Sequence, residues 1–118
     1  MNYFIKLKNG DQLISNVHVE EQNVILNRPL EIFMDVNPTS GSPGVSLVEW
    51  IPSPFVVDTI YPVSKSDVLF MTQASDMLSD YYENMKIRID NFRETVRNKF
   101  MGLQEEDQSE DKSKKSYH

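Results

Sequence analysis

Two histidines and one adjacent pair of acids are the side chains in this sequence whose type could perform acid–base chemistry. The histidines are His18, within a stretch of alternating apolar residues, and His118 in a charged tail. Glu20 and Glu21 are neighbours, and neighbouring residues of an extended chain point to opposite faces. The sequence has no cysteine and no glycine-rich phosphate loop, and its histidines lack the spacing of metal ligands. We therefore expect no enzyme activity, no metal site and no cofactor.

Other side chains could bind a partner. The basic residues Lys86, Arg88, Arg93, Arg97 and Lys99 could form a surface for nucleic acid or an acidic partner. The more common alternative is a solvated helix face with salt bridges to Asp90 and Glu94. A docking groove could form from Met77, Met85, Met101, Tyr81, Tyr82 and Phe92. More often such residues belong to a core or a subunit contact.

The charge balance restricts the kind of partner. The chain has 12 Lys and Arg against 18 Asp and Glu, a net charge of −6. Such an acidic chain binds nucleic acid poorly without specific contacts, because phosphate neutralisation supplies most of that affinity. The tail from Gln104 holds five acids and three lysines and no aliphatic residue, so we expect it to be disordered. The remaining 9 basic and 13 acidic residues leave the folded part at −4.

Cysteine usage and hydropathy bear on the compartment. The absence of cysteine suits a reducing cytoplasm. The N-terminal residues lack a basic-then-apolar signal pattern, and no apolar run approaches the roughly 20 residues of a membrane helix. We therefore predict a cytoplasmic protein without a membrane partner.

Short strands must position the polar side chains of the first 73 residues. Residues alternate between apolar and polar from Tyr3, and Asn9–Asp11 is a turn signal. Pro29 permits a bulge or an edge position within a long extended stretch. The predicted strands are Tyr3–Leu7, Leu13–Val19, Val24–Val36, Val45–Ile51 continued after a Pro-Ser-Pro interruption by Phe55–Val63, and Val68–Thr72. Sequential short strands of this kind favour a small barrel.

The hydrophobic period changes to that of a helix from about Ser75. Apolar residues recur every three or four positions at Leu78, Tyr82, Met85, Ile89, Phe92 and Val96, with Leu103 seven positions later. Ser75 is the predicted N-cap and Gly102 the predicted end. A helix of about 26 residues spans ~39 Å, longer than a small barrel is wide. Part of it should therefore contact a partner beyond its own barrel. The predicted organisation is a barrel over 1–73, an amphipathic helix over 74–102 and a disordered tail over 103–118.

Residues 4–26 carry a resemblance to a known family. A strand and glycine turn at Leu7-Lys8-Asn9-Gly10 is followed by a bent strand with Leu13 and Val17, and then by Glu21 where the family usually has Asp. Gln22-Asn23-Val24-Ile25-Leu26 is similar to the loop and third strand. Over residues 1–72 the chain resembles the Sm-like family, which includes Sm and LSm proteins and bacterial Hfq. Ser15 replaces a frequent glycine, and the second motif around Tyr61 is only loosely similar.

The resemblance implies a fold and an assembly. The fold is mainly β, a small five-stranded bent-sheet barrel, here followed by a long C-terminal helix. In this family the edge strands four and five pair head-to-tail with the next subunit and close a ring. We therefore expect a homo-oligomeric ring, with subunit contacts from Trp50, Val68, Phe70, Met85 and Phe92. Trp50 could equally be a core residue.

The resemblance also implies a ligand. Sm-like rings bind single-stranded RNA through the loop after strand two and the loop before strand five. By position these residues are Gln22, Asn23, Tyr61 and Lys65. Asn and Gln can read base edges, and Tyr offers a stacking face. The alternative is that the two amides are ordinary turn residues and Tyr61 is a packed aromatic.

Two functions follow. The first is an RNA-binding or RNA-chaperone ring. The second is an oligomeric structural or protein-interaction module that presents its helix to a protein partner and binds no RNA. Short, divergent Sm-like proteins also occur in phages, and a phage origin is one expectation from the resemblance.

Overall fold

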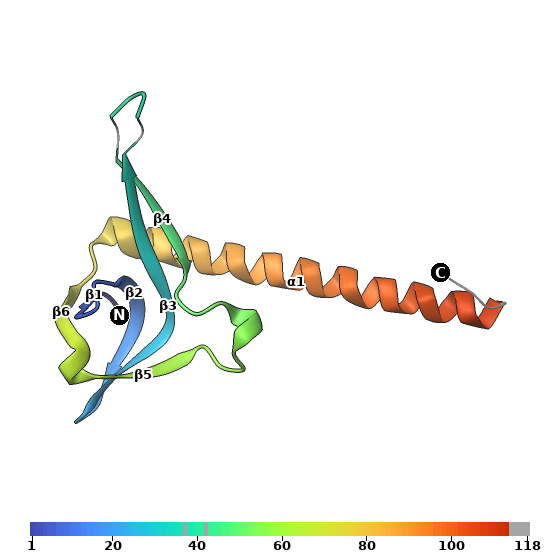
Figure 1. Ribbon diagram of the computed structural model, residues 1–118, viewed down its shortest axis with the longest axis horizontal. Helices are drawn as coiled ribbons and strands as arrows, with labels where there is room; N and C mark the ends of the chain where they lie inside the picture. The colour runs from blue at the N-terminus through green and yellow to red at the C-terminus, as the bar shows by residue number, and fades with distance from the viewer. Residues whose placement is uncertain (37, 42, 114–118) are drawn as a thin grey trace. The chain divides into compact units, whose positions relative to one another are not determined.

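The described part of the chain contains six strands and one long helix (Figure 1). The computed structural model describes residues 1–36, 38–41 and 43–113, with side chains up to residue 99 except those of 43 and 53. The strands are β1 Asn2–Leu7, β2 Gln12–Val19, β3 Asn23–Val36, β4 Pro43–Glu49, β5 Ile60–Ser64 and β6 Val68–Gln73. Short 3-10 turns, Ser53–Phe55 and Lys65–Asp67, precede β5 and β6, and α1 spans Asp76–Ser113.

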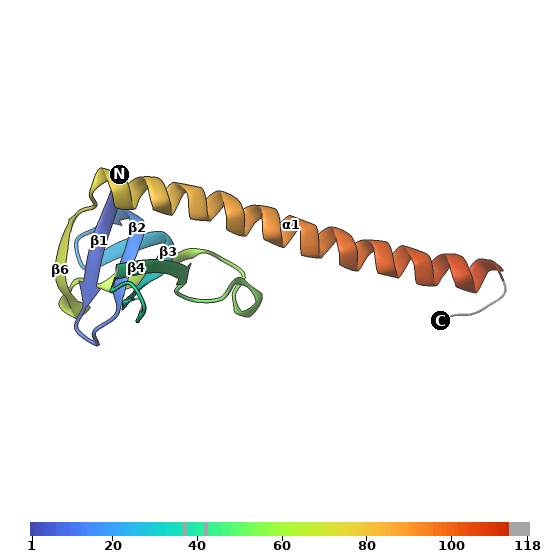
Figure 2. The ribbon, with the colours of Figure 1, turned by 90° about the horizontal axis from the view of Figure 1, so that it is seen from above.

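All strand pairings are antiparallel and belong to one sheet. The strand order is β4-β3-β2-β1-β6, and β5 pairs with the first half of β3. Figure 2 shows β6 beside β1 at one end of this order. The prediction of a mainly β protein with a C-terminal helix is therefore confirmed.

The predicted five-stranded bent-sheet barrel differs from the structure on two points. The sheet has six strands and is not closed into a barrel. The predicted fourth strand is split because Pro52 and Pro54 lack the backbone N–H that a ladder needs. Its first part, β4, pairs with Leu30–Val36 of β3, and its second part, β5, pairs with Asn23–Asn27.

The inner face of the sheet holds the main core. The predicted alternation in β1 is confirmed, since Ile5 and Leu7 are buried on this face. They pack with Leu13, Val24 and Leu26 from the next two strands. Burial of five such side chains contributes roughly 1.5–3 kcal/mol each. This core makes β1, β2 and the first half of β3 the rigid frame of the molecule.

The start of α1 agrees with the predicted N-cap. The Ser75 hydroxyl accepts a hydrogen bond from the Leu78 backbone N–H, at 3.2 Å. The helix does not end at Gly102 but continues to Ser113. A glycine costs a helix interior only about 1 kcal/mol, so it need not end the helix. The disorder predicted for residues 103–118 stays a prediction, and residues 114–118 lie outside the described part.

The chain divides into two compact units, residues 1–82 and 83–118. The first seven residues of α1 therefore belong with the sheet. The second unit is the remainder of the helix, where Lys86 and Glu83 form an ion pair at 3.0 Å.

Candidate functional site

Two loops that the sequence predicts to act together lie side by side. The backbone N–H of Lys65 donates to the carbonyl oxygen of Gln22 at 3.0 Å. Asn23 pairs with Ser64 across β3 and β5, and its carbonyl accepts from the Glu20 N–H at 2.8 Å. We call Gln22, Asn23 and Lys65 the loop group. Its amides and ammonium could hydrogen-bond the edge of an unpaired base.

Tyr61 is not part of the loop group. It pairs with Leu26, a fully buried core residue, whereas Asn23 lies three positions earlier on β3 and so points to the opposite face. The Tyr61 hydroxyl donates to the Asp58 carbonyl at 2.8 Å, and its ring meets Trp50 edge-on with centroids 6.3 Å apart. These contacts fit a packed strand aromatic better than a stacking platform.

The charge around the loop group is mixed. Glu20 and Glu21 are exposed in the same turn, and the Glu20 carboxylate lies 3.8 Å from the His18 imidazole. Lys65 is the one cation within the loop group itself. Such a site favours base contacts over phosphate contacts, because phosphate binding needs a surplus of positive charge.

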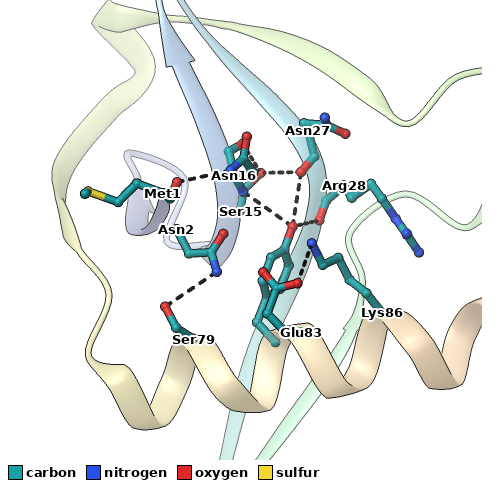
Figure 3. A network of polar contacts seen from close by, with 10 residues as sticks. Met1, Asn2, Ser15, Asn16, Asn27, Arg28, Ser79, Glu83 and Lys86 are labelled. Carbon is teal, nitrogen blue, oxygen red and sulfur yellow. Dashed lines mark hydrogen bonds and ion pairs between the residues drawn. The ribbon is translucent and has the colours of Figure 1, made fainter.

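A fully buried tyrosine, Tyr82, joins α1 to the sheet. Its hydroxyl contacts backbone groups of Arg28, Asn27 and Asn16, which are labelled in Figure 3. Its hydroxyl lies 2.8 Å from the carbonyl oxygen of Arg28 and 3.1 Å from that of Asn27, and accepts from the Asn16 N–H at 3.4 Å. A hydroxyl has one proton, so it donates to one carbonyl at a time. The shorter distance favours Arg28.

A bulge in β3 explains why these carbonyls need a partner. The β2–β3 register shifts between Ile14 and Asn16, so that two residues of β3, Arg28 and Pro29, face one residue of β2, Ser15. The buried Ser15 hydroxyl lies 3.1 Å from the Asn27 carbonyl and 2.8 Å from that of Asn16. Tyr82 and Ser15 thus satisfy carbonyls that the bulge removes from the ladder. The bulge that Pro29 permitted is confirmed.

Arg28 holds the strained backbone of this bulge. Its φ is 58°, the left-handed region that non-glycine residues rarely adopt, and Pro29 follows it. Residues before proline strongly prefer extended conformations, so the strain costs of order 1–3 kcal/mol. Its N–H donates to the Thr59 carbonyl at 2.8 Å, which helps to hold it. The sequence did not lead us to predict the roles of Tyr82 and Arg28 at this bulge. The Arg28-Pro29 pair was the signal that could have indicated it.

A second group missed from the sequence joins the β1–β2 turn to β3 and β4. The Trp50 indole N–H donates to the Asp11 carboxylate at 3.1 Å, and the Asn9 amide donates to the same oxygen at 3.3 Å. Glu31 of β3 lies close to the same carboxylate. Desolvation raises the pKa of Glu31, and the nearby Asp11 carboxylate raises it further.

The proximity of Glu31 and Asp11 predicts that the stability of the fold depends on pH. A carboxyl whose folded pKa is raised destabilises the fold once it ionises, so stability falls as pH rises from 4.5 through the folded pKa. Glu31→Gln should raise the melting temperature at pH 7 and flatten this slope. Trp50 is the sole tryptophan, so its emission reports on the Asp11 contact during a titration. Glu21→Gln, at an exposed turn position, is the control; an unchanged slope in Glu31→Gln would contradict the assignment.

The predicted subunit contacts fall in different environments. Trp50 and Val68 are partly buried and pack against the core, which gives both a role within the subunit. Phe70 on β6 is 52% exposed and meets Phe4 edge-on at 6.2 Å. In the second unit Met85 is half-buried and Phe92 is 70% exposed. Phe70 and Phe92 therefore remain accessible to a partner.

The sheet ends in two edges. Within the described residues β4 pairs only with β3, and β6 only with β1. β6 contains no charged residue, and β4 has only Glu49 at its end. Exposed apolar side chains stand on both strands: Val45 and Val48 on β4, and Leu69 and Phe70 on β6. Natural edges are normally protected by charges, bulges or covering segments.

Across the residues that the structure describes, no group of three or more His, Cys, Asp or Glu side chains could hold a metal ion. No helix in that part of the chain is long and apolar enough to span a bilayer. Compared with known proteins, the chain matches no protein-family model and no curated protein.

Proposed function

We propose that this chain is an Sm-like assembly module whose copies pair head-to-tail, β4 to β6, and close into a ring. β4 and β5 together would take the place of the family's fourth strand, and β6 that of the fifth. The observation that carries the proposal is the pair of edge strands, β4 and β6, each of which has a strand neighbour on one side only in the described residues, with their apolar side chains and near absence of charge. Pairing different edges is heterologous, so the subunits form a closed ring if the rotation closes.

We further propose that the ring binds single-stranded RNA through the loop group. The adjacency of Gln22 and Lys65 supports this, because the hydrogen bond from the Lys65 backbone N–H to the Gln22 carbonyl holds the two loops together. Each subunit of a ring would carry one loop group, so several weak contacts would act together on one RNA strand. Tyr61 is left out of the proposed contact because it packs on the core side of β5.

A protein-interaction module is the second candidate. The net charge of −6 disfavours a broad RNA surface. The exposed apolar side chains Ile87, Phe92 and Val96 of α1 favour a protein partner for the helix. In this version the ring presents its helices and the loop group binds nothing.

Native mass spectrometry with and without a short U-rich or A-rich RNA tests both steps. We expect a closed oligomer that gains the mass of one oligonucleotide. A double variant, Gln22→Ala with Lys65→Ala, should weaken RNA binding at least about tenfold, or 1.4 kcal/mol, without changing the ring. A ring that ignores RNA at every salt concentration would favour the second candidate. A monomer at all concentrations would refute the assembly.

A further inference from the structure

The part of α1 in the second unit carries an apolar seam. We use this name for Met85, Ile89, Phe92 and Val96, which are spaced by four, three and four residues and therefore share one side of the helix. Phe92 is 70% exposed and Val96 49%, while Met85 and Ile89 are half-buried. Two apolar positions in every seven residues are typical of a helix that packs against another helix in a coiled coil.

Basic side chains border this seam. In a coiled coil, the positions that flank the seam residues face the partner helix. Arg88 and Arg93 occupy such positions on opposite sides of the seam, and Lys99 continues the seam itself, three positions after Val96. By helical periodicity, the acids between positions 83 and 99 lie on the other side of the helix: Glu83, Asp90 and Glu94. The seam therefore fits an apolar surface that is bordered by carboxylates.

The basic flanks disfavour a second copy of this chain as the occupant. In a parallel pair Arg88 of one helix would face Arg93 of the other, and in an antiparallel pair each basic flank would meet its own counterpart. A parallel pair in register would also bury Lys99 against the same lysine of the other copy. The acidic stretch 105–111 cannot fold back onto the seam, because α1 continues as a helix through Ser113.

Nucleic acid and lipid also fit this surface less well. Phosphates offer nothing apolar to Phe92 and Val96, and the net charge of −6 on the chain opposes binding to any polyanion or anionic bilayer. Helices that lie on membranes have a wide apolar face, whereas this seam is narrow.

We propose that α1 forms a coiled coil with an acidic amphipathic helix of a different protein. Apolar side chains of that helix cover Phe92 and Val96, and its carboxylates pair with Arg88, Arg93 and Lys99. The inference rests on the second candidate function, a protein partner for α1, and names the class of that partner. It depends neither on the ring nor on RNA binding, because the seam lies within the second unit.

The test measures binding of the full-length chain to two synthetic helical peptides. Both carry leucine at the two seam positions of each heptad; one has glutamate at the flanking positions and the other has lysine. We expect the glutamate peptide to bind at least about tenfold more tightly, with an affinity that falls as salt rises. Arg88→Glu with Arg93→Glu should reverse this preference, an outcome that loss of folding cannot produce.

A second pair of variants locates the contact on the helix. Phe92→Asp places a carboxylate in the seam and should weaken binding of the glutamate peptide at least about tenfold. Asn98→Asp adds the same group at an exposed position on the opposite side of the helix, so it should bind the peptide as the wild type does. Circular dichroism checks that each variant keeps its helix.

Equal binding of the two peptides, or binding of neither, would overturn the proposal. It would also be overturned if Phe92→Asp dissociated the chain's own oligomer, or if it abolished binding to RNA or to phosphatidylserine vesicles, because another occupant would then cover the seam. Native mass spectrometry of the wild type without peptide reports on the ring separately. A wild-type monomer that prefers the glutamate peptide would refute the ring and support the coiled coil.

Discussion

Replacing Tyr82 with phenylalanine is expected to lower the free energy of unfolding by about 1–3 kcal/mol. The aromatic ring of phenylalanine still fills the fully buried site of Tyr82. However, the Arg28 carbonyl loses its hydrogen-bond donor at 2.8 Å, and the Asn16 N–H loses its acceptor at 3.4 Å. A water molecule cannot take the place of the hydroxyl, because the fully buried site has no room for it. The hydrogen bonds that the bulge made to this hydroxyl are therefore lost without replacement. Tyr82→Ala adds a cavity and should cost about 3–5 kcal/mol.

The neighbouring Tyr81 supplies the control for this experiment. Its hydroxyl donates to the Val45 carbonyl at 3.0 Å in an exposed setting, so Tyr81→Phe should cost less than about 1 kcal/mol. Urea unfolding followed by circular dichroism at one fixed protein concentration compares the variants, because assembly would shift apparent stability. Equal losses for Tyr81→Phe and Tyr82→Phe would contradict the role assigned to the buried hydroxyl.

Val48→Lys is expected to dissociate the proposed ring while leaving the single chain folded. Val48 lies on the β4 edge strand, where a copy pairing with it would take the lysine ammonium out of water, and that desolvation costs several kcal/mol even beside a carboxylate. The dissociation constant should therefore rise at least about 100-fold. Within the subunit, Val48 pairs directly with Glu31. A lysine there would favour ionised Glu31 and lower its pKa toward the usual range.

The same variant therefore has opposite expected effects on assembly and on the subunit. Sedimentation or native mass spectrometry measures the first, and a thermal melt at pH 7 the second. Val57→Lys, in the exposed loop before β5, should leave the oligomer mass unchanged. An intact oligomer for Val48→Lys would mean that the β4 edge is not a subunit contact.

Local patterns in the sequence were enough to locate most elements. The alternation around Ile5 and Leu13 placed β1 and β2, and the turn at Gly10 has the positive φ of 101° that glycine adopts readily. The hydroxyl of Ser75 caps α1 as predicted. These features depend on residues close in sequence, so short-range chemistry determines them. The loop group followed from the family resemblance, and its residues do lie together.

Contacts between distant segments decided the rest. The two prolines after β4 predicted an interruption of the strand. Only the pairing with opposite halves of β3 made β4 and β5 separate strands. Periodicity placed Tyr82 on an apolar seam, whereas its hydroxyl serves a bulge more than 50 positions earlier, at Asn27 and Arg28. The sequence alone determined a mainly β chain with a terminal helix, because propensity and period are local. Only the tertiary structure decided that the sheet stays open, that Asp11 meets Trp50, and which face Tyr61 takes, because these depend on long-range register.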